Sequence, residues 1–376
     1  MDFSFSDEQS LLKDSLERFV QLEYEFSARQ KLVKTELGYS TDHWRKFAEL
    51  GWLGVAFPEA DGGFGGGPIE TMLVMEQFGR GLVVEPYVPT VVLVGGMLAA
   101  AGKAAQKQQY LMPLLEGTLQ GACAFAEPQS RFNLADVATT AKRIGNGYVL
   151  NGRKSVVLNG PSADVLIVAA RTSSGQRKQS GITLFLVDAS TTGITRRDYP
   201  TVDALRASEL TLENVVVPRT AVLGRVGKGL DVLTQAIDYA TLAIGAEAVG
   251  CMEVLYKTTV EYCKTRVQFG QPIGKFQVLQ HRMVDMFMEH EQSKSLMFMA
   301  AMRLAEGYDA QAQKAVSAFK VQVGKSGRFV GQNAVQLHGG MGMTEELNVG
   351  HYFKRLTMID TMFGNVDYHL KRFGAL

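Results

Sequence analysis

The spacing of apolar residues changes twice along the chain, from a helical period to an alternating one and back again. Near the start, Ser6 and Gln9 have the spacing of a helix-capping box. The apolar residues that follow recur on one helical face: Leu11, Leu12, Leu16, Phe19 and Val20. Further helices are predicted near Thr41, over 70–79 and over about 105–116. The first third of the chain is therefore expected to be helical.

From about residue 121 the apolar period shortens towards two, which is typical of strands. Short runs rich in Val, Ile, Thr and Leu predict strands at 122–126, 137–144, 148–150, 155–158, 164–171, 182–187 and 209–217. Three Asn-Gly pairs punctuate these runs: Asn146-Gly147, Asn151-Gly152 and Asn159-Gly160. Because Asn-Gly supplies the positive φ of tight hairpin turns, a mostly antiparallel sheet is expected.

Long helical patterns return near residue 228, over about 230–266, 276–306 and 310–337, and a short helix is expected after Asn365. Long helices joined by short turns indicate an antiparallel bundle. The chain is thus predicted to be an α+β multi-domain protein. Its expected parts are an N-terminal helical domain (1–118), a middle antiparallel β-domain (119–226) and a C-terminal four-helix bundle (227–376).

Composition narrows the classes of function. The 376 residues contain 39 Lys and Arg against 38 Asp and Glu, so no net charge favours nucleic acid or an anionic membrane surface. No apolar run reaches the roughly eighteen residues of a membrane span, and the first thirty residues do not read as a secretion signal. A cytoplasmic location is expected. The three cysteines have no CxxC spacing, and the six histidines show no metal-binding spacing, so no metal site is expected.

Four motifs indicate the chemistry. They are GACAFAEP at 121–128, YVLNGRKSVVLNG at 148–160, RVQFGQPIGKFQ at 266–277 and QLHGGMGMTEE at 336–346. In this order they resemble the acyl-CoA dehydrogenase family, in which the first two flank the flavin ring and the last two bind the flavin dinucleotide. The resemblance implies FAD as cofactor, an acyl-CoA thioester as substrate, α,β-desaturation as the reaction and electron-transfer flavoprotein as acceptor.

Within that family, two segments look most like the small subunit of pimeloyl-CoA-type dehydrogenases: EPQSRFNLADVATTA at 127–141 and GITLFLVDAS at 181–190. This similarity implies a homologous large subunit as partner, or a homo-oligomer, in a dimer or tetramer. A second interpretation is a catalytically silent structural subunit that lends FAD-dinucleotide contacts to its partner. A third is an oxidase that passes electrons from flavin to oxygen. Chain length and head group of the acyl substrate are not evident from the sequence.

The family reaction requires a carboxylate that removes the thioester α-proton while hydride passes to flavin. The resemblance puts the usual glutamate position at Gly364, and the position used by isovaleryl and long-chain types at Ala240. Neither residue accepts a proton. Glu247, two helical turns beyond Ala240, and Asp367 are the remaining candidate bases. Their simpler interpretations are an interhelical polar group for Glu247 and a favourable helix N-terminal charge for Asp367.

The resemblance also divides the cofactor-binding residues into two groups. The ring-side positions are Phe125, Ala126, Val156 and Leu158. The resemblance implies that the family's Thr, Trp and Thr are replaced at Ala126, Val156 and Leu158, and that the Thr and Gln of its final turn are replaced at Val366 and Tyr368. The positions that the family uses for a neighbouring subunit's pyrophosphate and adenine are retained: Arg266, Phe269, Gln277, Gln336, Gly339 and Gly340. We therefore expect the chain to help hold a partner's FAD. Buried Val156, Leu158 and Val366 would leave polar atoms of the flavin edge without hydrogen bonds, at a cost in affinity. The chain's own ring site is therefore expected to be degenerate or remodelled, or to rely on backbone N–H groups alone.

Overall fold

The computed structural model describes residues 5–376, and their contacts divide the chain into two compact units. One unit contains the residues up to 31 together with 68–83 and 241–376, and the other contains 32–67 and 84–240. Both units draw on the helical N-terminal third, so they do not coincide with the three predicted ranges, which stay a prediction. The order of helical, β and helical elements is confirmed.

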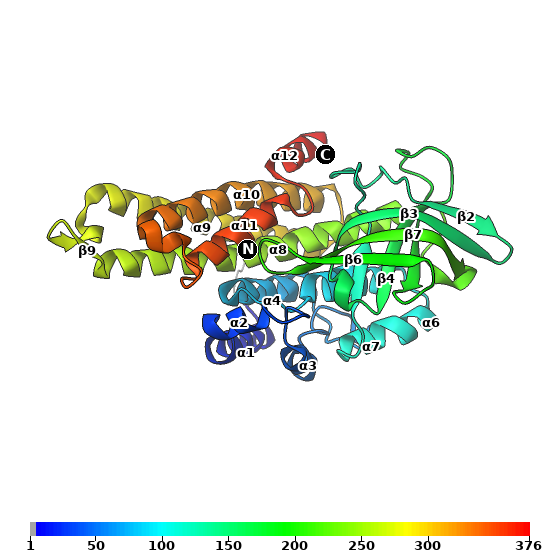
Figure 1. Ribbon diagram of the computed structural model, residues 1–376, viewed down its shortest axis with the longest axis horizontal. Coiled ribbons are helices and arrows are strands. Elements are labelled where there is room, and N and C mark those ends of the chain that lie inside the picture. The colour runs from blue at the N-terminus through cyan, green and yellow to red at the C-terminus, as the bar shows by residue number, and fades with distance from the viewer. Residues whose placement is uncertain (1–4) are drawn as a thin grey trace. The chain divides into compact units, whose positions relative to one another are not determined.

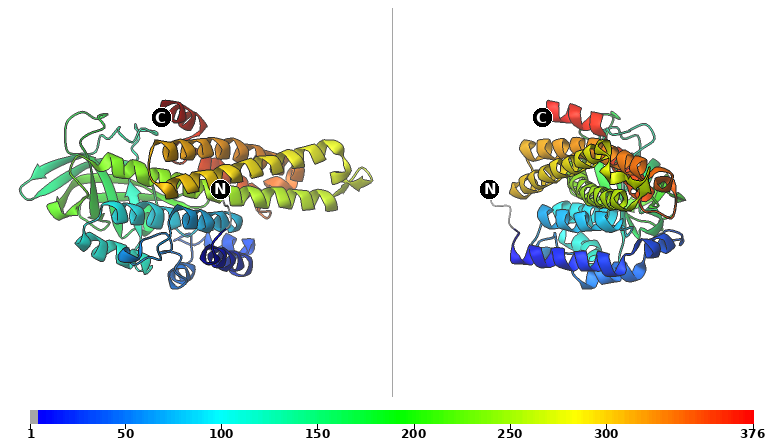
Figure 2. Two further views of the ribbon diagram at one scale, coloured as in Figure 1. Left: turned by 180° about the vertical axis from the view of Figure 1, so that it is seen from behind. Right: turned by 90° about the vertical axis from the view of Figure 1, so that its left-hand side faces the viewer.

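The first unit is built from helices. They are α1 (Asp7–Glu23), α2 (Phe26–Leu32), α4 (Pro68–Gly81), most of α8 (Gly229–Thr265), α9 (Gln277–Glu306), α10 (Ala310–His338), α11 (Val349–Thr361) and α12 (Val366–Ala375). Helix α10 packs against α9, α11 and α12, while α4 packs against α1 and α9. Figures 1 and 2 show α9 and α10 side by side along their length. Ser6 caps α1 in the predicted capping box.

Two glycines allow α4 and α8 to touch through their backbones. A Cβ atom at Gly250 would lie 2.0 Å from the carbonyl oxygen of Glu76, and one at Gly79 would lie 2.0 Å from that of Glu247. Neither distance is possible between real atoms, so only glycine fits at these two crossings. The close approach places Glu247 in the interior of the unit, where it is 3% exposed.

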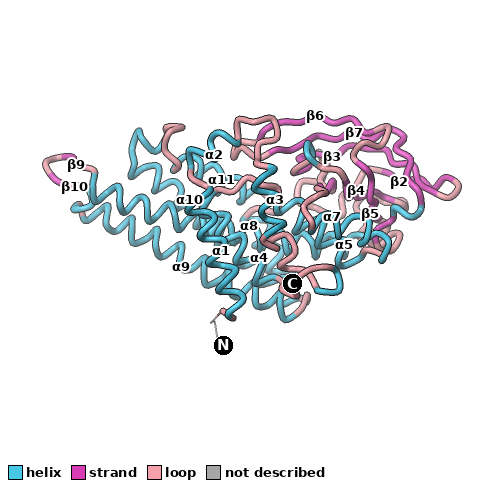
Figure 3. Tube along the Cα trace, turned by 90° about the horizontal axis from the view of Figure 1, so that it is seen from below, coloured by secondary structure: helices cyan, strands magenta, loops and turns pink. Residues whose placement is uncertain are grey.

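The second unit contains the sheet. Its strands are β1 (Gly121–Ala124), β2 (Thr140–Ile144), β3 (Gly147–Leu158), β4 (Val165–Arg171), β5 (Ile182–Asp188), β6 (Ile194–Pro200), β7 (Arg206–Pro218) and β8 (Val222–Leu223). The order is β6-β7-β3-β2-β4-β5-β8, with β1 beside β4 (Figure 3). Only the pairings of β4 with β1 and β2 are parallel, so the mostly antiparallel sheet is confirmed.

Helical segments of the second unit precede the sheet in sequence. They are α3 (Thr41–Glu49), η2 (Val88–Gly95), α5 (Gly96–Ala101), α6 (Ala104–Gln106), η3 (Lys107–Leu111) and α7 (Met112–Leu115). Apolar side chains of the sheet's inner face form a continuous core that includes Leu150, Val168, Phe185, Leu212 and Val215. This core holds the ends of β1 and β3, which carry the ring-side positions, in a fixed register.

The structure corrects the predicted turns. Only the pair Asn146-Gly147 lies at a hairpin, where Ile144 pairs with Gly147. Asn151-Gly152 lies inside β3, which joins two strands predicted separately, and Asn159-Gly160 follows its end. Strand β6 was not predicted, because its residues ITRRDYP are largely exposed and lack apolar alternation. The helices η2, α5 and α11 were also not predicted.

Candidate flavin and substrate site

The ring-side positions are brought together by contacts between the bulged part of β3 and the segment that follows β1. The N–H of Ser155 donates to the carbonyl oxygen of Ala126 at 2.9 Å. The Lys154 ammonium lies 3.5 Å from the carbonyl oxygen of Phe125. Val156 and Leu158 continue the same strand. Residues that are about thirty positions apart in the sequence therefore meet at one place.

A buried ion pair anchors this meeting point. Lys154 is fully buried, and its Nζ lies 2.7 Å from Oε1 of Glu127. The Glu127 carboxylate also accepts the backbone N–H groups of Ala138 and Thr139. Burial acts to raise the pKa of this carboxyl, but the charge of Lys154 and the hydrogen bonds outweigh it and hold the pKa below its usual range. Glu127 is therefore ionised at neutral pH.

The apolar ring-side residues are not buried as the sequence suggested. Val156 is 50% exposed, and Leu158 and Val366 are each partly exposed. An exposed side chain does not force a ligand's polar atom into an apolar interior, so the desolvation cost expected at Val156 is smaller.

The predicted dinucleotide residues lie at the surface of the first unit. The segment between α8 and α9 forms a short hairpin of β9 (Val267–Gln268) and β10 (Gln271–Pro272), within which Phe269 is 90% exposed. Tyr262 near the end of α8 stacks on His338 at the end of α10, with ring centroids 4.3 Å apart. This stack brings the two flavin signatures to the same end of the helices. All six residues predicted to contact the dinucleotide are exposed: Arg266, Phe269, Gln277, Gln336, Gly339 and Gly340.

These residues suit a dinucleotide. A side chain placed at Gly339 or Gly340 would meet nothing within 4 Å, so a ligand has free access to the backbone there. The guanidinium of Arg266 is the kind of donor that pairs with pyrophosphate oxygens, and the amides of Gln277 and Gln336 are further donors. Charge and donor chemistry are therefore compatible with the phosphate side of FAD.

The turn that carries Gly364 has no room for a side chain. Gly364 has a φ of +111°, and a Cβ there would lie 2.3 Å from Cδ1 of Tyr368 and 2.7 Å from Nε2 of His369. The Lys320 ammonium holds the turn by donating to the carbonyl oxygens of Gly364 (2.6 Å) and Asp360 (3.0 Å). Burial lowers the pKa of Lys320 to about 7.

Sequence reasoning did not single out Lys320. The signal for it is a lone lysine within the largely apolar segment AVSAFKVQV at 315–323. A cation in such a segment requires acceptors, which here are backbone carbonyl groups.

The remaining candidate bases lie in different surroundings. Arg355 donates to both carboxylate oxygens of Glu247, from Nε at 2.5 Å and from Nη2 at 2.6 Å. Ala240 is fully buried within α8. Asp367 is exposed in the first turn of α12, a helix whose N-terminus is capped by Asn365. Neither carboxylate is both unpaired and enclosed, which are the conditions that raise basicity in a protein site.

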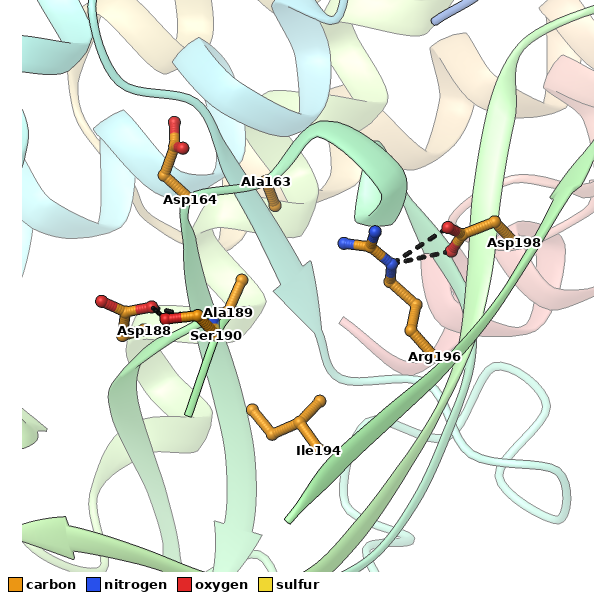
Figure 4. Close-up of a pocket in the computed structure, with 8 residues that line it drawn as sticks. All are labelled: Ala163, Asp164, Asp188, Ala189, Ser190, Ile194, Arg196 and Asp198. Carbon is orange, nitrogen blue, oxygen red and sulfur yellow. Dashed lines mark hydrogen bonds and ion pairs between the residues drawn. The ribbon is translucent and has the colours of Figure 1, made fainter. Parts of the chain in front are cut away.

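A polar pocket of about 580 Å³ opens beside the ends of β4, β5 and β6 (Figure 4). Its charged groups are already paired: Arg196 with Asp198, and the Asp188 carboxylate with the hydroxyl of Ser190. Asp164 accepts the N–H of Gln120 at 2.8 Å. The pocket is lined by none of the predicted flavin positions.

Two further findings concern the described residues. Within 5–376, His, Cys, Asp and Glu side chains do not gather in groups of three or more that are able to hold a metal ion. The helices of that same range are too short or too polar to cross a membrane.

Comparison with known proteins identifies the fold. The sequence models of the N-terminal, middle and C-terminal domains of acyl-CoA dehydrogenases match residues 6–118, 122–215 and 227–375. The short-chain-specific acyl-CoA dehydrogenase of Megasphaera elsdenii is 31% identical over 370 residues, which cover 94% of each chain. Among solved structures, the FAD complex of PigA superposes with a TM-score of 0.92 at 26% identity, covering all of this chain and 98% of that chain.

The ChsE4-ChsE5 complex from Mycobacterium tuberculosis superposes with a TM-score of 0.90 at 28% identity, again covering all of this chain and 98% of that chain. The three domain matches follow one another in the family's order and leave only short connecting segments unmatched. From its sequence matches, its fold and its flavin signatures, the chain belongs to the acyl-CoA dehydrogenase family of FAD-dependent oxidoreductases.

Proposed function

We propose that this chain acts with a homologous large subunit in the α,β-desaturation of an acyl-CoA thioester, and that it lends contacts to the dinucleotide of FAD bound across the subunit boundary. The observation that carries the proposal is the contrast between two sites. The residues predicted to contact the dinucleotide are exposed, whereas the turn at Gly364 is closed to any side chain. A chain of this fold occurs in the ChsE4-ChsE5 complex, which supports an association of this chain with a second, different chain.

The roles of the residues follow from their chemistry. Arg266 pairs with a pyrophosphate oxygen, and Gln277 and Gln336 donate amide hydrogens to the same part of the cofactor. Bound FAD supplies the acceptor for the hydride that leaves the β-carbon. This chain offers no carboxylate at Gly364 or Ala240, so the proton from the α-carbon passes to a base on the large subunit. Electron-transfer flavoprotein is the proposed final acceptor.

Replacing Gly364 by glutamate is expected not to create activity in the isolated chain. The new Cβ would overlap the rings of Tyr368 and His369, and the left-handed backbone disfavours any residue except glycine. We expect the free energy of unfolding to fall by about 1–3 kcal/mol. The measurements are acyl-CoA-dependent dye reduction and urea unfolding. Acyl-CoA oxidation that appears only in Gly364→Glu would contradict the closed-turn interpretation.

Replacing Arg266 by alanine is expected to lower the flavin content of the co-purified complex by about tenfold under dilute conditions, because one charge-assisted contact to pyrophosphate is lost. Arg303→Ala is the matched control, since Arg303 is an exposed arginine near the far end of α9 and pairs only with Glu306 among the contacts identified. The measurement is the ratio of flavin absorbance to protein absorbance after gel filtration. Unchanged flavin in Arg266→Ala would refute the lending role.

The silent-subunit function is separated from this proposal by the visible spectrum of the purified chain, alone and with its partner. If the lone chain holds stoichiometric flavin that an acyl-CoA bleaches, the silent function is excluded. If flavin appears only in the mixed complex, at half occupancy, the silent-subunit function is supported and the chain's own ring site is unused.

A further inference from the structure

Strand β3 contains a β-bulge next to the positions assigned to the flavin ring. Its register with β7 shifts between Lys154 and Val157, so that Ser155 and Val156 together face the single residue Glu209. A bulge bends its strand and re-aims a side chain, and bulges are frequent beside active sites. Here the re-aimed side chain belongs to Val156.

Val156 has an unfavourable conformation. Its φ of +51° lies in the left-handed region, which a β-branched side chain adopts only under constraint. Its apolar side chain is 50% exposed, so burial does not compensate for the strain. Strained residues persist where the surrounding structure enforces them, and they cluster at ligand sites. The contacts that keep Val156 in this conformation therefore indicate a role at a ligand site.

Glu209 and Tyr199 supply those contacts. The N–H of Val156 donates to Oε1 of Glu209 at 3.2 Å, and the hydroxyl of Tyr199 donates to the same oxygen at 2.8 Å. Burial acts to raise the pKa of Glu209, but the bonds from Tyr199, Val156 and Ser155 outweigh it and lower the pKa. The carboxylate is thus ionised at neutral pH and holds the bulge from the side of β7.

The other side of the bulge is attached to the segment after β1. The N–H of Ser155 donates to the carbonyl oxygen of Ala126. The bulge is therefore held from two sides, at Ser155 by Ala126 and at Val156 by Glu209, and the Val156 side chain is half-exposed. The Val156 side chain thus offers an apolar surface at a position where the family's polar side chains are missing from the ring pocket.

We infer that Glu209 and Tyr199 are positioning residues for the flavin ring, and that they hold Val156 as an apolar surface for the ring face. The inference rests on the proposed function and adds that this chain has a working ring site. The face of an aromatic ring packs on apolar side chains. The loss of polar side chains at Ala126, Val156 and Leu158 is then a remodelling of the site.

The first test compares variants of Glu209 in the co-purified complex, stripped of flavin and titrated with FAD. Glu209→Met removes the acceptor and is expected to weaken FAD binding to this chain's site about tenfold. It should also change the visible circular dichroism per bound flavin. Glu209→Gln keeps an acceptor oxygen and should bind within about twofold of the unaltered complex. Glu213→Met on the same strand is the control and should change neither quantity.

The second test uses Val156→Gly, which removes the apolar contact and relieves the left-handed strain. FAD binding is expected to weaken while the urea midpoint of the chain stays equal or rises. A merely structural role for Val156 would not separate these two quantities.

The outcomes separate a failure of the proposed function from a failure of the inference about the ring site. If the unaltered complex binds no flavin, the proposed function fails and this inference fails with it. If the unaltered complex binds flavin at half occupancy, with this chain's ring site unused, the inference is overturned while the lending of dinucleotide contacts stands. If the unaltered complex binds flavin at this chain's site but Glu209→Met matches it in affinity and circular dichroism, only the inference is overturned. Weakened binding in Val156→Gly that is accompanied by an equal loss of stability would also overturn it.

Discussion

Replacing Arg355 by methionine is expected to lower the free energy of unfolding by about 3–5 kcal/mol. Arg355 and Glu247 are 5% and 3% exposed, and the guanidinium meets both carboxylate oxygens at 2.5 and 2.6 Å. Methionine fills much of the same volume but leaves a buried carboxylate without a counter-charge. The measurement is urea unfolding of the flavin-free chain, followed by far-ultraviolet circular dichroism.

The control for this prediction is the double variant Glu247→Leu with Arg355→Met, which removes both charges and should recover most of the lost stability. Arg303→Met breaks an exposed pair and should cost less than about 1 kcal/mol. If Arg355→Met also costs less than about 1 kcal/mol, the buried pair is not important for stability. Glu247 would then be available again as a candidate base.

Replacing Lys154 by methionine is expected to have a comparable effect, about 3–5 kcal/mol, because Glu127 would be left buried without its cation. This change also alters the dependence of stability on pH. The folded pKa of Glu127 lies below that of an unfolded glutamate, which is about 4.3. Stability from the ionised carboxylate is therefore complete above the unfolded pKa and is lost as pH falls through the folded pKa.

Without Lys154, burial moves the folded pKa of Glu127 up towards or above the unfolded value. As pH falls, protonation then relieves the buried carboxylate, so the variant should lose less stability than the unaltered chain, or gain some. Urea midpoints measured between pH 7 and pH 4 test this expectation. Lys264→Met, which breaks the exposed pair with Glu261, serves as the control and should leave the pH profile unchanged. Parallel pH profiles for Lys154→Met and the unaltered chain would show that Lys154 does not set the pKa of Glu127.

The elements that the sequence predicted well are those with a strong local period. The bounds of α8, α9 and α10 lie within one or two residues of the predicted helices, because an apolar stripe at helical spacing is visible in one segment alone. Strand β6 has no such signal. It forms because its backbone pairs with β7 at the edge of the sheet, and that pairing depends on residues of another segment.

The sites show the same division. That Gly364 and Ala240 carry no carboxylate is a property of the sequence, since side-chain identity does not depend on folding. Whether a side chain fits at Gly364 depends on Tyr368 and His369, whose rings reach the turn only after α12 has docked. The strain at Val156 is likewise visible only in the folded sheet.

The sequence by itself determined the family and the order of elements, because motifs and local periods are written in consecutive residues. Only the tertiary structure decided which charged groups form buried ion pairs. Glu247 and Arg355 stand 108 residues apart in the chain, and Lys154 and Glu127 stand 27 apart. Their pairing follows from the crossing of helices and the register of strands, which cannot be read from the amino-acid sequence alone.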